Sequence, residues 1–389
     1  MAHAQKDVIT LLGVGDISPN RDDPPSIFRH CGDVFRTADI VFGQMEAALS
    51  DRGTPGFTPG VPSKLAAKNI SALTEKGAGF DVMSFASNHA VDYGYDAFFD
   101  TLDALKSNNI AVTGAGRNIA EARTPVILER NGTKVGFLAY LSIVFPGLIA
   151  EEDTPGCVPL RASHYYKQMD FQPGTPPLIV TELFPEDKNA MEEDIRKLRP
   201  QVDVLVVSTH AGVHFVPATV AMYQKEAAYL AIDTGADLVL QHHAHILKGI
   251  EVYNGKAIFY GLGNFALEHS KTPAAKKKTG GTGYRNVLGQ FYRIKPIPGW
   301  ETYHYLPDAR MTMIAKAYIQ DNKIRKVCYI PTYVNPQSEP EVVTRKDPRA
   351  QEVFDYVNRI SEAQELNVGF SWDGDEVLVN AGREQGAVA

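Results

Sequence analysis

Residues 236–245 read ADLVLQHHAH, a short apolar run that is followed, after Gln241, by His242, His243 and His245. Residues 202–212 read VDVLVVSTHAG and have the same form, with His210 just after the apolar run. Short apolar runs bounded by polar residues are typical of buried β-strands. Because chemistry in open α/β sheets sits at the carboxyl ends of the strands, both stretches predict a functional site at one sheet edge.

The same arrangement recurs at three earlier strand ends. Asp16 ends the run VITLLGVGD, Glu46 follows ADIVFGQM, and Asn88 and His89 follow FDVMSFAS. Each residue alone has an ordinary reading, as a helix cap, a surface carboxylate or a hydrogen-bonded structural histidine. Five consecutive strand ends that carry oxygen and nitrogen donors together favour a metal or proton-transfer site.

The periodicity between these motifs predicts strands alternating with helices, which is the pattern of a layered α/β fold. The helices are expected at residues 63–76, 95–106, 187–198, 221–234 and 347–360. The strands are expected at residues 7–14, 38–43, 80–85, 110–113, 126–129, 134–141, 202–208 and 236–240, with a hairpin at 249–260 and further strands within 286–333.

The donor set favours two metal ions over one. The candidate donors at these strand ends exceed the four that a tetrahedral zinc ion needs. A carboxylate has two oxygens and can bridge two ions, and a pair of ions about 3.5–4 Å apart can activate a shared water. His243 and His245 alternate, so on an extended segment both would face the same side, and His242 would point away from the site.

The composition limits the other function classes. The chain has 389 residues, a formal net charge of −7 and an apolar fraction of 44%. An acidic chain lacks the basic surface that nucleic-acid binding needs, so no nucleic-acid partner is expected. The start MAHAQKDVITLLGVGD does not resemble a signal peptide, no stretch reads as a membrane span, and the three cysteines are widely spaced. We therefore expect a cytoplasmic protein that does not interact with membranes, and homo-oligomerisation stays open.

The order of these motifs resembles the calcineurin-like metallophosphatase superfamily and, within it, the bacterial poly-γ-glutamate capsule synthesis (CapA-like) branch. The similar segments lie in order between residues 8 and 265. The resemblance implies an α/β fold of metallophosphatase type, a four-layer α/β/β/α sandwich with metals at one edge. It also implies two divalent metal ions as cofactors, which could be Zn, Mn, Fe or Co.

The resemblance assigns a role to each strand-end residue. The expected ligands of the first metal ion are Asp16 and His245, and those of the second are Asn88, His210 and His243.

Four further roles are implied around these ligands. Glu46 would bridge the two ions, and His89 would be a proton donor beside them. Asp92 would hold His89 in its orientation, since catalytic histidines usually need such a partner. Asn264 is expected to contact substrate.

Two departures from the usual pattern of the branch point to a reshaped substrate pocket. Ala211 stands where the branch usually has Trp, and His214 stands where Glu is common. The irregular segment 142–177 is typical of a functional loop, and its Tyr165 and Tyr166 are expected to contact an apolar or aromatic substrate. Ordinary loop packing would explain the same two tyrosines.

Residues 1–335 are expected to form one catalytic domain, with loop insertions at 142–177 and 266–285. Residues 336–389 would be a C-terminal extension packed on the same domain. The second insertion contains Lys276–Lys278. This charge run indicates a solvated loop or, alternatively, a clamp for an anionic substrate.

The functional prediction is a dinuclear metal-dependent hydrolase that acts on a small-molecule or peptide-like substrate. A metal-bound hydroxide would attack a carboxylic amide, ester or lactone bond. This bond type is favoured because the branch is associated with amide-linked glutamate polymers and because no arginine fork for phosphate lies beside the motifs. Two alternatives stay open: a phosphoester hydrolase, and a non-enzymatic accessory protein in the assembly of an anionic polyglutamate-type polymer.

Overall fold

Two β-sheets form the centre of the protein, seen in a computed structural model that describes residues 8–56, 63–171, 174–269 and 297–382. The first sheet has the order β21-β22-β19-β18-β1-β2-β5-β6, with β17 paired to β1 and β20 paired to β19. Its strands are β1 (Ile9–Ser18), β2 (Ile40–Met45), β5 (Val82–Ser84), β6 (Ala111–Thr113), β17 (Asn264–Leu267), β18 (Met311–Gln320), β19 (Lys323–Val334), β20 (Pro340–Val342), β21 (Gly369–Asp373) and β22 (Glu376–Asn380).

The second sheet has the order β15-β16-β14-β13-β9-β8. Its strands are β8 (Val126–Arg130), β9 (Thr133–Leu141), β13 (Val204–His210), β14 (Leu238–His242), β15 (Ile250–Tyr253) and β16 (Lys256–Phe259). The central strands β9, β13, β14 and β16 are parallel, as are β17, β1, β2, β5 and β6 in the first sheet. Parallel strands end at the same edge, which brings their following residues together.

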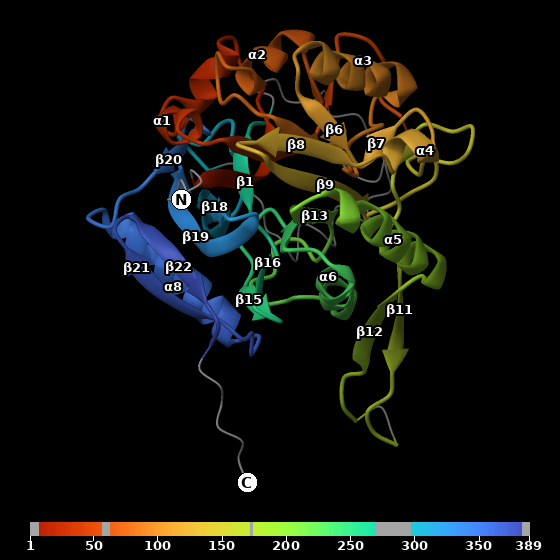
Figure 1. Cartoon of the computed structure of the whole chain (residues 1–389), viewed down its shortest axis with the longest axis vertical. Helices are drawn as coiled ribbons and strands as arrows, with labels where there is room; N and C mark the ends of the chain where they lie inside the picture. The colour runs from red at the N-terminus through yellow and green to blue at the C-terminus, as the bar shows by residue number, and fades with distance from the viewer. Residues whose placement is uncertain (1–7, 57–62, 172–173, 270–296, 383–389) are drawn as a thin grey trace, which may run out of the picture.

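The sheets pack face to face through an apolar seam, and helices cover both outer faces (Figure 1). Phe42 on β2 stacks on Phe137 on β9 across this seam, with ring centroids 5.7 Å apart. The helices are α1 (Gly32–Arg36), α2 (Ile70–Leu73), α3 (Gly94–Ser107), α4 (Ile119–Ala122), α5 (Pro185–Leu198), α6 (Met222–Thr234) and α8 (Pro348–Glu362). Helices α1 to α3 pack on the first sheet, while α5 and α6 pack on the second. The predicted fold class, a four-layer α/β/β/α sandwich, is confirmed.

The region after residue 335 is built into the same body. Strand β20 pairs with the end of β19, and the hairpin β21–β22 extends the first sheet beyond β19. Helix α8 buries Val353, Tyr356 and Val357 in the apolar seam between the sheets. The catalytic domain was predicted to end at residue 335. That residue lies between β19 and β20, which pair with each other.

Segment 142–177, predicted as an irregular loop, contains regular structure in part. Its residues 162–167 form β11 (Ala162–Lys167), which pairs antiparallel with β12 (Leu178–Leu183). This hairpin projects from the body beside α5 and α6 (Figure 1). The other short strands are β3 (Ala48–Leu49), β4 (Lys64–Leu65), β7 (Ala115–Gly116) and β10 (Gly156–Cys157).

The helix predicted at residues 63–76 is wrong. The segment holds strand β4, a 3-10 turn at Ala67–Asn69 and the single turn of α2. Leu65 pairs with β3, so tertiary pairing overrides the local helical pattern. Most of the predicted insertion 266–285, including Lys276–Lys278, lies outside the described residues.

Within the described residues, no helix has the length and apolar character needed to cross a membrane. The predicted cytoplasmic location stays a prediction.

Candidate metal centre

Six predicted ligands come together where the strands of both sheets end. Asp16 lies near the end of β1, and Glu46 directly follows β2. Asn88 lies in the loop after β5, His210 ends β13, and His243 and His245 lie in the loop after β14. We call these six residues the cluster.

A close backbone approach places Asp16 in the cluster. The amide of Asp16 donates a hydrogen bond of 3.0 Å to the Gly263 carbonyl oxygen. A Cβ atom at Gly15 would lie 1.9 Å from that same oxygen. Only glycine therefore allows β1 to approach residue 263, and any side chain at position 15 would displace Asp16.

Three donor atoms converge in what we call the Asn88 half of the cluster, formed by Asn88, His210 and His243. Asn88 Oδ1 lies 2.7 Å from His210 Nε2 and 3.2 Å from His243 Nδ1. The two imidazole nitrogens are 3.1 Å apart. Ligand atoms bound at about 2.0–2.1 Å around a tetrahedral ion stand about 3.3 Å apart, so this spacing matches a ligand set.

Asp16 and His245 form the other half, which we call the Asp16 half. Asp16 Oδ2 lies 3.3 Å from His245 Nδ1. Asn264 Oδ1 lies 2.7 Å from the same Nδ1 and accepts its hydrogen bond. His245 Nε2 is thereby left with its lone pair facing Glu46 Oε1, at 3.8 Å.

Glu46 stands between the two halves. Its Oε2 lies 3.4 Å from His210 Nε2, while its Oε1 faces His245. Glu46 accordingly belongs to two groups of potential ligands whose donor atoms lie within 4.8 Å of one another, one with His210 and His243 and one with Asp16 and His245. One carboxylate oxygen per half is the placement that a bridging ligand needs.

The electrostatics of the cluster fit cations. Both carboxylate oxygens of Asp16 and Oε1 of Glu46 are buried without a hydrogen-bond partner among the described residues. Burial raises the pKa of Asp16 to about 8, and burial together with the Asp16 charge raises the pKa of Glu46 well above its usual value. Buried carboxylates are costly unless a positive charge compensates them, and divalent ions would supply that charge.

The environment of the cluster favours neutral histidines, the form that metal ligands need. Burial, together with the neighbouring imidazoles, lowers the pKa values of His210, His243 and His245 well below the usual histidine value. Neutral imidazole offers a lone pair to a metal, whereas imidazolium does not. The donor set present in the chain therefore fits divalent ions of the Zn, Mn, Fe or Co type.

The route by which His243 and His245 reach the cluster differs from the prediction. The expectation of two side chains on one face assumed an extended segment. Both residues instead have left-handed backbone, with φ of 85° for His243 and 55° for His245. The turn sends the two imidazoles to different halves of the cluster. His242 is fully buried, with Nδ1 3.9 Å from Asp16 Oδ1.

His89 lies beside the cluster rather than in it. Its Nδ1 donates to Asp92 Oδ2 at 2.6 Å, and the Asp92 side chain is fully buried while 22% of the His89 side chain is exposed. His89 directly follows Asn88, and its backbone N–H donates to Ser87 Oγ, which itself donates to Glu46 Oε2. The structure thus brings together the predicted proton donor, its partner and the predicted ligands.

His214 and two aromatic rings flank the imidazoles of His243 and His245. The His214 ring centroid lies 3.9 Å from that of His243 and 5.2 Å from that of His245. Phe215 and Tyr305 lie against the His245 ring, at 5.6 Å and 5.3 Å. Sequence reasoning found His214 but missed Tyr305, which lies beyond the motifs and follows no pattern that marks it.

The other residues predicted to contact substrate lie in different parts of the structure. Tyr165 and Tyr166 lie on the projecting β11–β12 hairpin with exposed side chains, and they are not among the residues that surround the cluster. Asn264 is fully buried, and both ends of its amide are in use, because Nδ2 donates to the Tyr303 hydroxyl at 3.1 Å. Asn264 therefore orients His245, and its predicted contact with substrate stays a prediction.

Ala211 also differs from its predicted role. It is fully buried in the core beneath α6, with Tyr223 and Ala227 in the same apolar group. The interpretation of Ala211 as opening a substrate pocket is wrong, because the side chain faces packed core.

The variant Ala211→Trp is accordingly expected to unfold more easily. Overpacking a filled core costs about 1–3 kcal/mol. Thermal and urea unfolding of the variant and the wild type measure the loss. An unchanged unfolding midpoint, with only a raised KM, would instead support the pocket interpretation.

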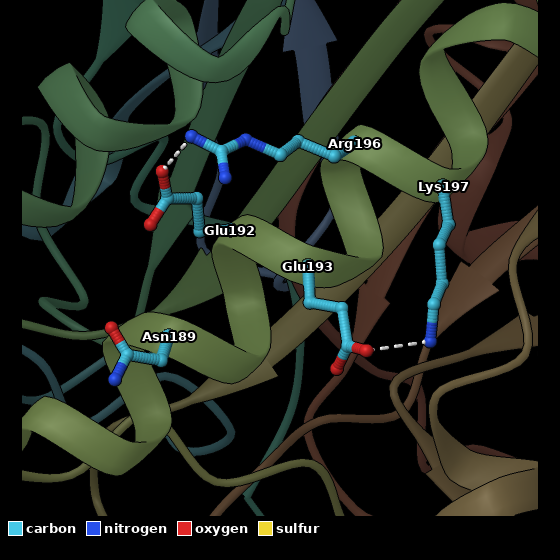
Figure 2. A pocket seen from close by; sticks show the side chains of 5 residues that line it. All are labelled: Asn189, Glu192, Glu193, Arg196 and Lys197. Carbon is cyan, nitrogen blue, oxygen red and sulfur yellow. Dashed lines mark ion pairs between the residues drawn. The ribbon is translucent and has the colours of Figure 1, made fainter.

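A surface hollow elsewhere on the chain has a different character. It has a volume of about 420 Å³ and lies on helix α5, lined by Asn189, Glu192, Glu193, Arg196 and Lys197 (Figure 2). Glu192 pairs with Arg196 and Glu193 with Lys197, each one helical turn apart. Exposed i,i+4 ion pairs are typical of a solvated helix face, so the cluster remains the candidate site.

Comparisons with known proteins identify the family of the chain. Residues 7–269 match the family model described as "Bacterial capsule synthesis protein PGA_cap". The chain is 28% identical over 279 residues to the capsule biosynthesis protein CapA of Bacillus anthracis, covering 69% of this chain and 62% of that relative. It is 27% identical over 230 residues to a probable polyglutamine synthesis accessory protein of Mycobacterium tuberculosis, covering 58% of this chain and 55% of that one.

Among solved structures, the chain is similar to the calcineurin-like phosphoesterase YfkN from Bacillus subtilis. The TM-score is 0.40 and the identity 12%, over 92% of this chain and 99% of that one. The family match alone spans more than half of the chain and confirms the resemblance to the CapA-like branch. The chain therefore belongs to the bacterial capsule synthesis protein family PGA_cap.

Proposed function

We propose that this protein is a dinuclear metal-dependent hydrolase. The observation that carries the proposal is the position of Glu46, whose two oxygens face two separate sets of buried donors. Two divalent ions bound there would lower the pKa of a shared water and hold the substrate oxygen. The ligand roles proposed for Asp16, Glu46, Asn88, His210, His243 and His245 are those predicted from the sequence.

The residues beside the ligands supply the proton chemistry. Asp92 accepts the Nδ1–H of His89 and so fixes the tautomer and the ring orientation. The Nε2 position of His89 is then the one that delivers a proton to the leaving group, as a general acid does. Positioning by a buried carboxylate is the usual support for such a histidine.

We propose a carboxylic amide, ester or lactone as the bond that is cleaved. Among the described residues, the ion pairs of Asp16 and Glu46 are all with histidines, and no guanidinium fork is aimed at the cluster. Phosphate recognition commonly uses such a fork. Phe215 and Tyr305 beside His245 suit an apolar or aromatic portion of a small-molecule or peptide-like substrate.

An accessory role in polymer assembly is the second candidate. A Mycobacterium tuberculosis relative is named as a probable accessory protein of polyglutamine synthesis. The chain spans only 62% of the length of the Bacillus anthracis relative. An accessory protein would retain the cluster but turn over no substrate.

A paired screen of the full chain, loaded with Mn²⁺ or Zn²⁺, tests the proposal. We expect hydrolysis of aryl esters, lactones or γ-glutamyl anilides to exceed that of aryl phosphates. Activity should be lost on dialysis against EDTA and should return with metal. Faster cleavage of aryl phosphates would overturn the proposed carboxylic bond type in favour of a phosphoester. Two bound ions without turnover of phosphates or of carboxylic substrates would favour the accessory role.

A further inference from the structure

We infer that Ser87 is a positioning residue for this centre. Its hydroxyl fixes the rotation of the Glu46 carboxylate between the two halves of the cluster and ties that carboxylate to the backbone of His89. The inference deepens the proposed dinuclear centre and rests on it.

The Ser87 hydroxyl both donates and accepts a hydrogen bond. Its Oγ donates to Glu46 Oε2 at 2.9 Å, and it accepts the backbone N–H of His89 at 3.0 Å. The residue is fully buried. One buried atom therefore joins the bridging carboxylate to the loop that carries Asn88 and His89.

The backbone of Ser87 is itself held in place. Its amide donates to the Phe85 carbonyl at 2.9 Å, and its carbonyl accepts the Ala90 amide at 3.1 Å. An anchored backbone and a side chain with a single torsion leave the hydroxyl little freedom. Ser87 can thus impose an orientation on Glu46 rather than follow it.

The orientation matters because the terminal torsion of a glutamate is intrinsically broad. Oε1 of Glu46 has no hydrogen-bond partner among the described residues, so only Oε2 is anchored by a protein hydrogen bond. Without the hydroxyl, the carboxylate can turn both oxygens toward one half. It would then bind a single ion in a bidentate manner instead of bridging two.

The variant Ser87→Ala tests this in the full chain, with Mn²⁺ as the probe. Manganese is titrated into metal-free protein by calorimetry, and the loaded protein is examined by electron paramagnetic resonance. The wild type should bind two Mn²⁺ ions that give a spin-coupled signal. Ser87→Ala should bind the second ion about 10–100-fold more weakly and give the signal of uncoupled Mn²⁺.

Three further variants separate orientation from general packing. Ser84→Ala is the matched control, because Ser84 is equally buried and its hydroxyl has no hydrogen-bond partner among the described residues. It should keep the coupled signal. Ser87→Thr retains a hydroxyl and should restore coupling. Ser87→Cys has a side chain of similar volume and a weaker hydrogen-bond donor. If Ser87→Ala does not fold, Ser87→Cys is used in its place.

The outcomes are distinct. A coupled signal and unchanged affinities in folded Ser87→Ala would overturn the role of Ser87 while leaving the dinuclear centre intact. Equal losses in Ser84→Ala and Ser87→Ala would also overturn it, since they would show a packing effect. A wild type that binds fewer than two Mn²⁺ ions would overturn the dinuclear centre, and the bridge with it.

Discussion

Replacing His243 by alanine is expected to remove metal and activity together. Its Nδ1 lies 3.1 Å from His210 Nε2 and 3.2 Å from Asn88 Oδ1, at the centre of the Asn88 half. Loss of this nitrogen leaves that half with one imidazole and one amide oxygen besides the shared Glu46. Such a set holds an ion weakly, because borderline metals favour imidazole ligands.

Plasma emission spectrometry after gel filtration measures this effect. The wild type should carry two ions per chain, and His243→Ala at most one, with no measurable hydrolysis. His164→Ala is the control, because His164 lies on the β11–β12 hairpin outside the cluster. Two ions per chain in the His243 variant would show that the ligand assignment is wrong.

The variant His89→Ala is expected to separate chemistry from metal binding. His89 contacts Asp92 and lies beside the ligands without joining either group of potential ligands around Glu46. The variant should therefore keep its metal and lose about 10²–10⁴-fold in kcat, the usual contribution of a general acid.

Substrates with different leaving groups sharpen this experiment. An activated aryl ester needs little protonation of its leaving group, so its hydrolysis should fall less than that of an amide. Metal content is measured on the same preparations. An unchanged kcat on the amide, or a parallel loss of metal, would rule out the proton-transfer role.

The strand ends were predictable because burial and chemistry coincide there. The apolar runs before Asp16, Glu46, His210 and His243 are long enough to be recognised as buried strands. Parallel pairing then brings the following polar residues to one edge. The α/β layering and the gathering of these polar residues at one edge could therefore be inferred without coordinates, whereas the ligand roles follow from the family resemblance.

Sequence reasoning fails where contacts between residues distant in sequence determine the local structure. Pairing of Leu65 with β3 replaces a helix that the local pattern favours. Left-handed backbone at His243 and His245 depends on the surrounding loop, and no periodicity encodes it. Asn264 lies in one of the sequence motifs, but only the fold shows that its amide bonds both His245 and Tyr303.

The role of the Ser87 hydroxyl could not be predicted from the sequence either. A serine next to Asn88 is an ordinary loop residue until its partner across the fold is known. Tyr305 is a similar case, because it follows β17 by some distance in sequence and meets His245 only through the fold.

The residues of the cluster come from different layers of the sandwich. Asp16 and Glu46 belong to strand ends of the first sheet, whereas His210, His243 and His245 belong to the second. The cluster can therefore assemble only after the two sheets have docked. Ions bound there would cross-link the two sheets and would close a loop of the chain that runs from Asp16 to His245. Metal loading would then report that folding is complete, because a chain with undocked sheets has no site to fill.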